Sequence, residues 1–178
     1  MSARVYQRAE SAVFCRTRDQ FGLLANFASL PLKWNGIRAC SSEAVYQALK
    51  FLDAHGQRPV LLAPTAYEAK TLARNSDALR FLPWEEHSIT AMRFVLRLKL
   101  FCYTDLISQT LALTGDRPIV EQSGHDSFWG AIPHPANGTL IGTNALGRLW
   151  MEIRQQLRDD TLCPTTAPVL NAPLTLHR

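Results

Sequence analysis

The sequence predicts an α+β fold that is mostly helical, with a small antiparallel sheet. Three observations lead to this prediction. Apolar residues recur with helical spacing in several segments, most clearly over 86–113 and 146–158. An Asn-Gly pair at 35–36 separates two short runs that suit strands. The chain of 178 residues is 47% hydrophobic, which is typical of one globular domain, here expected over residues 1–160.

The N-terminal part is predicted to contain a short strand over 11–15 and then a hairpin. The hairpin pairs residues 32–34 with residues 37–40. Its turn is Asn35-Gly36, because these two residues tolerate the positive φ angles that a two-residue turn requires.

Two helices are predicted next. The first begins after Ser41 or Ser42 and continues to about residue 55, just before Gly56. The second opens with Thr65 and Glu68, whose spacing is that of a capping box, and ends near residue 75.

The segment 86–113 has helical periodicity but is long for a single helix. We expect two helices that meet near Cys102, with Thr104 capping the second and Gly115 closing it. Residues 117–122 suit a strand. Residues 123–142 are rich in Gly and Pro and are expected to form a loop.

The last helix is expected over 146–158, with an apolar face and three arginines directed away from it. The face consists of Leu146, Leu149, Trp150, Ile153 and Leu157, and the arginines are Arg148, Arg154 and Arg158. Residues 161–178 contain three prolines and little charge. They are expected to form an extended tail, either lying on the domain or free of it.

Composition excludes several classes of protein. The net charge of +4 is mild, and no basic stripe is visible along the chain. The four cysteines are far apart and form no CxxC pair, which favours reduced thiols in the cytoplasm. A charged N-terminus and the interruption of the longest apolar stretch by Arg97 and Lys99 argue against a signal peptide and a membrane span. No histidine has metal-ligand spacing, so neither a metal nor a cofactor is expected.

One polar stripe occurs on the helix that begins near residue 42. Glu43, Gln47 and Lys50 lie about one turn apart each, and apolar residues occupy the rest of the helix surface. Two interpretations are open. Either the stripe faces solvent as a weak charge pair, or a mostly buried helix presents three polar groups to a cleft, where burial makes their pKa values adjustable.

Three further segments carry candidate site residues. Asp126 and Trp129 lie in a Gly-flanked loop, where the Trp either stacks on a base or anchors the loop. The segment 21–27 is either a pocket wall or a turn. The turn at 142–147 precedes a helix and resembles a phosphate-binding turn, but an ordinary N-cap by Asn144 is the favoured interpretation.

In order along the chain, these segments resemble the motifs of the NADAR (YbiA-like) family. Residues 21–27 (FGLLANF) are similar to the family's F-G-x-L-S-N-F, and residues 42–51 (SEAVYQALKF) to its S-E-H-x-Y-Q-A-x-K-F helix. Matches to the middle and later motifs are Trp84, Met92, Lys99, 114–116 (TGD), Glu121, 126–130 (DSFWG) and 144–154 (NALGRLWMEIR).

The resemblance covers about residues 12–158 and implies a YbiA-like domain with N-glycosidase activity that needs no metal. The substrates it implies are ribosylamino-pyrimidine intermediates of riboflavin synthesis, or guanine that carries ADP-ribose, either free or in a nucleic acid. Cleavage of a ribosyl C–N bond places positive charge on the anomeric carbon and negative charge on the leaving base.

The resemblance also assigns the site. Glu43 and Asp126 are the two carboxyl candidates for charge stabilisation and proton transfer, without a decision on which does which. Lys50 is either a nucleophile that forms a Schiff base with ring-opened ribose or a cation that holds phosphate. Substrate binding is expected from Phe21, Gly22, Asn26, Phe27, Gln47, Trp84, Glu121, Trp129, Gly130 and Asn144.

The chain departs from the family pattern at a few positions that concern the choice of substrate. Ala44 replaces a histidine, Ala25 replaces a serine, Ile132 stands where glycine is frequent, and the loop 133–141 is long. Two rival functions are a non-catalytic module that binds ADP-ribose or NAD, and a plain nucleic-acid-binding module. The first could dispense with Glu43 and Lys50, and the second requires a basic stripe.

Overall fold

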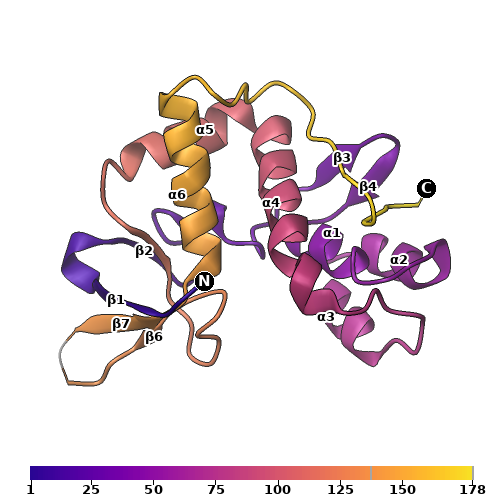
Figure 1. Cartoon of the computed structure of the whole chain (residues 1–178), viewed down its shortest axis with the longest axis horizontal. Helices are drawn as coiled ribbons and strands as arrows, with labels where there is room; N and C mark the ends of the chain where they lie inside the picture. Colours follow the sequence, from indigo (N-terminus) through magenta and orange to yellow (C-terminus); the bar gives the residue numbers. More distant parts are fainter. Residues whose placement is uncertain (137, 178) are drawn as a thin grey trace. The chain divides into compact units, whose positions relative to one another are not determined.

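A computed structural model describes residues 1–136 and 138–177, and these residues form two compact units (Figure 1). The first unit consists of Met1–Ala25 and Asp105–Cys163, and the second of Asn26–Thr104 together with the chain from Pro164 onward. Each unit therefore combines segments that are distant in the sequence.

In its described residues, the first unit contains two short 3-10 helices, two α-helices and two small sheets. Its helical elements are η1 (Arg8–Glu10), η2 (Gly22–Leu24), α5 (Thr104–Leu113) and α6 (Ala145–Arg158), and its strands are β1 (Arg4–Gln7), β2 (Ala12–Phe14), β5 (Ile119–Glu121), β6 (Ile132–Pro133) and β7 (Thr139–Gly142). One sheet is antiparallel in the order β1-β7-β6, and the other is the parallel pair β2-β5. The predicted α+β class with a small antiparallel sheet is confirmed, and the parallel pair is an addition to it.

The core of the first unit lies between its sheets and α6. Val120 of β5 and Leu140 of β7 are fully buried and belong to one apolar cluster. Four residues of the predicted apolar face of α6, Leu146, Leu149, Trp150 and Ile153, are buried, and Leu157 is half-buried. The indole Nε1 of Trp150 donates a hydrogen bond of 2.8 Å to the carbonyl oxygen of Leu24. That bond satisfies the one polar atom of a completely buried Trp.

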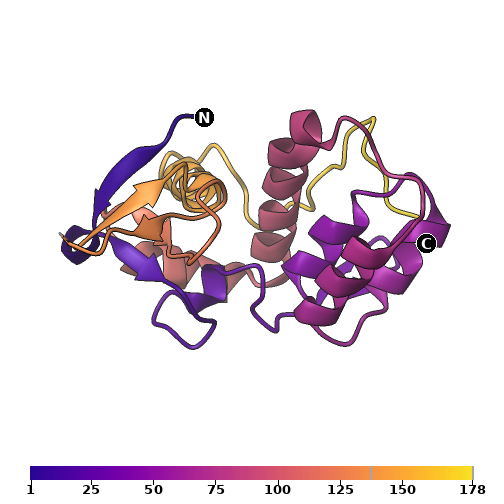
Figure 2. The same ribbon diagram turned by 90° about the horizontal axis from the view of Figure 1, so that it is seen from below.

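The second unit contains a hairpin and four helices. These are β3 (Leu32–Trp34), β4 (Ile37–Ala39), α1 (Ser42–Ala48), α2 (Ala54–Leu61), α3 (Ala66–Asn75) and α4 (Trp84–Cys102). In Figure 2, α1, α2 and α3 form a group beside the long helix α4. Every residue of α1 is buried.

Local sequence signals predicted several of these elements correctly. Asn35 and Gly36 have φ angles of 47° and 82° in the hairpin turn. The hydroxyl of Thr65 accepts a hydrogen bond of 3.1 Å from the backbone N–H of Glu68 at the start of α3. α4 and α5 meet at Tyr103, and Gly115 adopts a φ of 56° after α5. Thr104, however, is the first residue of α5, and its hydroxyl donates to the carbonyl of Phe101 instead of capping the helix.

The helix predicted from residue 42 to about 55 is instead two helices, and this prediction was wrong. α1 ends at Ala48 because the following residues pair with another segment. The N–H of Phe81 donates to the carbonyl of Lys50 (2.7 Å), and the N–H of Leu52 donates to the carbonyl of Leu79 (3.2 Å). α2 then starts afresh, with the carboxylate of Asp53 accepting from the N–H of Gly56.

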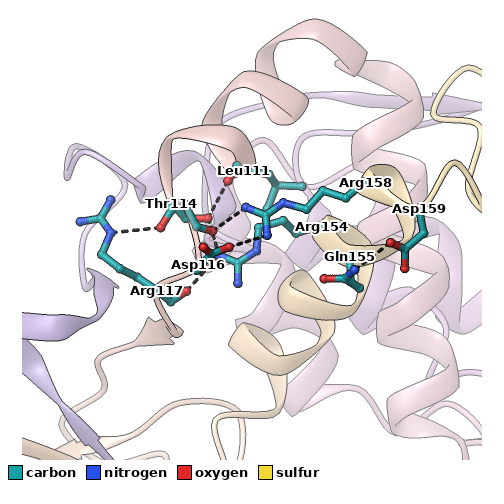
Figure 3. Close-up of polar contacts among 9 residues, drawn as sticks. Leu111, Thr114, Asp116, Arg117, Arg154, Gln155, Arg158 and Asp159 are labelled. Carbon is teal, nitrogen blue, oxygen red and sulfur yellow. Dashed lines mark hydrogen bonds and ion pairs between the residues drawn. The ribbon is translucent and has the colours of Figure 1, made fainter.

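Two other expectations need correction. The segment 123–142, expected to be a loop, contains the strands β6 and β7, and Asn137 lies outside the described residues. Arg154 does not point away from the core. It is 8% exposed, and its guanidinium Nη1 donates to the hydroxyl of Thr114 at 2.6 Å and to the carbonyl of Arg117 at 2.9 Å (Figure 3).

The C-terminal tail lies on the second unit. The indole of Trp34 donates to the carbonyl of Pro168 at 3.2 Å, and Leu174 is buried. Gln57 of α2 donates to the carbonyl of Thr175 and accepts from the N–H of His177. Among the helices in the described part of the chain, none combines the length and the apolar character needed to cross a bilayer.

Candidate functional site

Two of the three residues of the polar stripe, Glu43 and Gln47, are buried on α1. Glu43 and Gln47 are each 5% exposed, and Nε2 of Gln47 donates a hydrogen bond of 2.7 Å to Oε1 of Glu43. The interpretation of these two residues as a solvent-facing stripe is therefore wrong. A carboxylate in such a place needs hydrogen-bond donors, because desolvation otherwise favours its neutral form.

The N-terminus of α1 holds Glu43 in a fixed position. The hydroxyl of Ser41 caps the helix by accepting from the N–H of Ala44, and the N–H of Glu43 donates to the carbonyl of Asn26 at 3.1 Å. Glu43 also lies in the first turn of the helix, where the partial positive charge of the helix N-terminus stabilises a carboxylate.

Lys50 lies beyond the last turn of α1 against two aromatic rings. Its Nζ is 5.2 Å from the centre of the Tyr46 ring and 5.8 Å from that of the Trp84 ring. The two rings meet edge to face at 5.4 Å, and the indole of Trp84 donates to the hydroxyl of Tyr46 at 3.2 Å. This arrangement is an aromatic cage for an amine.

The environment of Lys50 changes the pKa of its amine. Burial lowers the pKa of Lys50 below its usual value, the carboxylate of Glu43 acts in the opposite direction, and the charges of Arg80 and Lys70 lower the pKa further. A larger fraction of the amine is therefore neutral near physiological pH than for an exposed lysine. The cage and Glu43 limit the shift because both favour the charged form.

Asn26 is joined to Glu43 by the backbone hydrogen bond described above, and Phe27 is the next residue in the sequence. The side-chain amide of Asn26 is 6% exposed, and its Nδ2 lies 3.1 Å from Sδ of Met92. Its Oδ1 is buried and has no hydrogen-bond partner among the described residues. Buried polar atoms are nearly always satisfied, so this oxygen is available to a donor of a bound ligand or to water. The ring of Phe27 is partly exposed and lies 5.4 Å from Nζ of Lys70.

The second unit thus joins six of the predicted site residues through direct contacts or neighbouring backbone. They are Asn26, Phe27, Glu43, Gln47, Lys50 and Trp84. The other seven belong to the first unit, and they are Phe21, Gly22, Glu121, Asp126, Trp129, Gly130 and Asn144.

Asp126 and Trp129 lie in a tightly ordered loop of the first unit. Oδ1 of Asp126 accepts from the N–H groups of Phe128 (2.9 Å) and Trp129 (2.8 Å). Asp126 is exposed, while Trp129 is half-buried with its ring 5.1 Å from that of Phe128. The carboxylate therefore holds the loop in shape through one oxygen.

The same loop caps α6. The carbonyl groups of Ser127, Gly130, Phe128 and Trp129 accept, in that order, from the N–H groups of four consecutive residues, 143–146. An anion at this helix start would need those N–H groups. Because they are already bonded, the resemblance of residues 142–147 to a phosphate-binding turn is not supported by the geometry.

Asn144 is fully buried in the position of the N-cap, but its side chain does not cap α6. Its Nδ2 donates to the carbonyl of Ile119 at 2.8 Å, and its Oδ1 accepts from the N–H of Glu121 at 3.1 Å. Asn144 thus joins the start of α6 to β5, and the expected side-chain N-cap is wrong. Its role in substrate binding stays a prediction.

Two glycines among the predicted residues have structural reasons to be glycine. A Cβ on Gly130 would lie 2.6 Å from the carbonyl oxygen of Glu121, and a Cβ on Gly22 would overlap the carbonyls of Arg16 and Thr17. Phe21 is buried, with the guanidinium of Arg117 5.3 Å from its ring centre. Contacts of these residues with a substrate stay predictions.

The Thr-Gly-Asp motif also has a structural role (Figure 3). Arg154 bonds to Thr114, and Arg158 forms an ion pair of 2.7 Å with Asp116 and donates to the carbonyl of Gly115 at 2.9 Å. These contacts attach the C-terminal half of α6 to the turn after α5. The motif therefore supports the fold of the first unit.

Two residues of the second unit were matched to the family motifs, but the sequence did not predict their structural roles. Tyr46 lies within the motif 42–51, but its contact with the amine of Lys50 was not predicted. The spacing could have indicated it, because a residue four positions before a lysine lies on the same face of a helix. Lys99 is 0% exposed in α4, and burial lowers the pKa of its amine to about 7. No pattern in the sequence distinguishes a buried lysine from an exposed one.

Comparison with known proteins identifies the family. Residues 13–158 match the NADAR domain. The chain belongs to the NADAR domain family. The resemblance inferred from the motifs is confirmed, and the residues matched include every candidate site residue named above.

Relatives within the family carry enzyme names. The chain is 34% identical over 144 residues to the N-glycosidase YbiA of Shigella boydii, with 81% of the chain and 86% of that protein covered. It is 36% identical over 146 residues to a riboflavin biosynthesis protein of Vibrio vulnificus, but it spans only 38% of that protein's length. These names support the prediction of a hydrolase of N-glycosyl bonds.

A solved structure supports the fold. The NMR structure of the Escherichia coli protein YbiA matches with a TM-score of 0.71 at 29% identity, covering 87% of this chain and 92% of that one. The predicted YbiA-like fold is thereby confirmed. The residues beyond 158, which include the tail, lie outside the family match.

Proposed function

We propose that this protein is an N-glycosidase that hydrolyses the C–N bond between ribose and a nitrogenous base in a ribosyl or ADP-ribosyl substrate. The observation that carries the proposal is the cluster on α1, where a buried, hydrogen-bonded carboxylate lies near an amine with a lowered pKa in an aromatic cage. The N-glycosidase names of the relatives support it.

The lowered pKa of Lys50 favours its role as a nucleophile over its role as a cation that holds phosphate. A neutral amine can attack the C1′ carbon of a ring-opened ribosylamine, which is itself an imine of the base's amino group. The amine of Lys50 adds to the C=N bond, which gives a C1′ carbon bonded to both nitrogens. A proton moves from the lysine nitrogen to the nitrogen of the base, the C1′–N bond to the base breaks, and the base leaves as its free amine while the lysine imine forms. Water then hydrolyses the lysine imine, which releases the ribose aldehyde and restores the lysine.

Glu43 is suited to the proton transfers in this sequence. Protonating the departing amine and removing a proton from the attacking water both require a carboxyl group near C1′. Gln47 orients this carboxyl group through its hydrogen bond of 2.7 Å. Trp84 and Tyr46 supply aromatic surface beside the amine, and the unpaired Oδ1 of Asn26 supplies an acceptor. Asp126 remains the second proposed carboxyl group.

The substrate is proposed to be either a ribosylamino-pyrimidine intermediate of riboflavin synthesis or guanine modified with ADP-ribose. The name of the Vibrio relative favours the first. A non-catalytic module that binds ADP-ribose or NAD is the rival function. The cluster on α1 argues against it, since binding alone does not require an amine with a lowered pKa beside a buried carboxylate.

The test is incubation of the purified protein with each substrate, with the released base followed by mass spectrometry. The wild type should release base from one of the two substrates, whereas Lys50→Ala and Glu43→Gln should fold and lose most turnover. Lys33→Ala, a change of an exposed lysine on β3, is the control and should keep full activity. Binding of ADP-ribose without release of base from either substrate would favour the non-catalytic module.

A further inference from the structure

A second candidate site lies in the second unit, away from the stripe on α1. A depression of about 490 Å³ is formed by the hairpin, α2 and the end of the C-terminal tail. Arg38 of β4, Arg58 of α2 and His177 of the tail all line it. A space of this size suits a ligand as large as a nucleotide.

The charged side chains that line this depression are positive. No carboxylate lines it, and the segments 31–42, 54–63 and 164–177 that build this face contain no Asp or Glu. Within the described part of the chain, the side chains of Arg38 and Arg58 form neither an ion pair nor a hydrogen bond. Two guanidinium groups without counter-charges that share one depression repel each other, and an anion bound there would relieve that repulsion.

The remaining lining of the depression is apolar. Ile37 and Leu61 are buried, and Leu62 is 69% exposed on the rim. A ligand that fits must therefore join an anionic group to a body with an apolar face. Phosphate monoesters of heterocyclic compounds have this combination, and guanidinium groups bind phosphate oxygens through paired hydrogen bonds.

We propose that this depression binds the phosphate monoester of a small heterocyclic molecule, such as a nucleoside monophosphate. Arg38 and Arg58 bind the phosphate, and Leu61 and Leu62 contact the heterocycle. The proposal does not depend on the glycosidase function, because its residues are separate from Glu43 and Lys50.

The C-terminal tail contributes one side of the depression. His177 reaches the depression because its N–H donates to Oε1 of Gln57 at 2.8 Å, while Nε2 of Gln57 donates to the carbonyl of Thr175 at 2.9 Å. Nε2 of Gln57 also donates to the carbonyl of Phe51, next to Lys50. The NADAR match ends at residue 158, so a component of this site lies outside the family domain.

Calorimetric titration of the full-length protein with adenosine 5′-monophosphate tests the proposal. Saturable binding is expected, and Arg38→Ala and Arg58→Ala should each weaken it at least tenfold. Arg74→Ala removes the same charge from an exposed position of α3 that does not line the depression, and should leave the affinity unchanged. Adenosine, which lacks the phosphate, should bind at least tenfold more weakly.

A single-stranded oligonucleotide distinguishes the source of the phosphate. If it binds more tightly than the mononucleotide and the two arginine variants weaken it equally, the site serves phosphates of a polynucleotide. If the mononucleotide binds more tightly, the ligand is a free phosphate monoester. No saturable binding of either probe, or affinities that are the same in wild type, Arg38→Ala and Arg58→Ala, would overturn the proposal.

Discussion

Gln47 donates a hydrogen bond of 2.7 Å to the carboxylate of Glu43, and both side chains are buried on α1. The same kind of contact occurs at the end of α6, where Gln155 donates at 2.8 Å to Asp159, the residue that follows the helix (Figure 3). That second pair is exposed. A comparison of the two pairs therefore shows how much of the contribution of such a hydrogen bond to stability depends on burial.

We expect Gln47→Met to destabilise the protein by about 1.5–3 kcal/mol, because a buried carboxylate loses a donor. Turnover should also fall, since the orientation of Glu43 is no longer fixed. Gln155→Met is the matched control and should change stability by less than about 0.5 kcal/mol. Urea unfolding and initial rates of both variants measure these effects, and equal stability losses in the two would refute the assigned role of burial.

Asp126 tests whether a carboxylate of the first unit takes part in the reaction. Asp126→Asn keeps an oxygen that can accept from the N–H groups of Phe128 and Trp129, so the loop should retain its shape and melting temperature. Asp126→Ala should cost about 1 kcal/mol of stability, as for the loss of a helix cap. If Asp126 transfers protons, both variants lose turnover. Full activity of the Asn variant would remove Asp126 from the mechanism.

Trp129 distinguishes substrate stacking from loop anchoring. Trp129→Phe keeps an aromatic face and should retain most of the affinity for substrate. Trp129→Ala should weaken substrate binding by about 1–3 kcal/mol, the usual range for stacking on a base. The half-buried ring predicts a smaller loss of stability than that of a fully buried Trp. Unchanged substrate affinity together with a large drop in melting temperature would instead identify Trp129 as an anchor.

The lowered pKa of the buried Lys99 predicts how the stability of the protein depends on pH. Burial lowers the pKa of Lys99 from 10.5 to about 7, so between these values the unfolded chain binds more protons than the folded one. Stability should therefore rise as the pH increases from about 7 towards 10.5. Lys99→Met should be more stable than the wild type below pH 7 and should lose most of this rise. A stability profile that is identical in wild type and variant would contradict the buried, shifted amine.

Sequence signals identified the elements that depend on neighbouring residues. The hairpin turn at Asn35-Gly36, the cap of α3 by Thr65 and the positive φ of Gly115 each follow from the conformational preference of one or two residues. The stripe of Glu43, Gln47 and Lys50 was visible for the same reason, because helical spacing alone places the three on one face.

The features that the sequence did not predict depend on residues far apart in the chain. α1 ends at Ala48 because Lys50 and Leu52 pair with residues 79–81, which no local pattern reveals. β7 forms because it pairs with β1, with Leu140 opposite Tyr6. Arg154 was expected to face solvent, since a charged residue on a helix usually does, and the positions of Thr114 and Arg117 explain its burial.

The central claim is that the amine of Lys50 bonds to the sugar during turnover, and borohydride trapping tests it most directly. Borohydride added during turnover should reduce the lysine imine to a stable amine, and peptide mass spectrometry should locate the sugar adduct on Lys50. Lys50→Ala should give no adduct, and Lys33→Ala should give the wild-type result. Absence of an adduct from an enzyme that is turning over under these conditions would contradict the claim and leave Lys50 an electrostatic role.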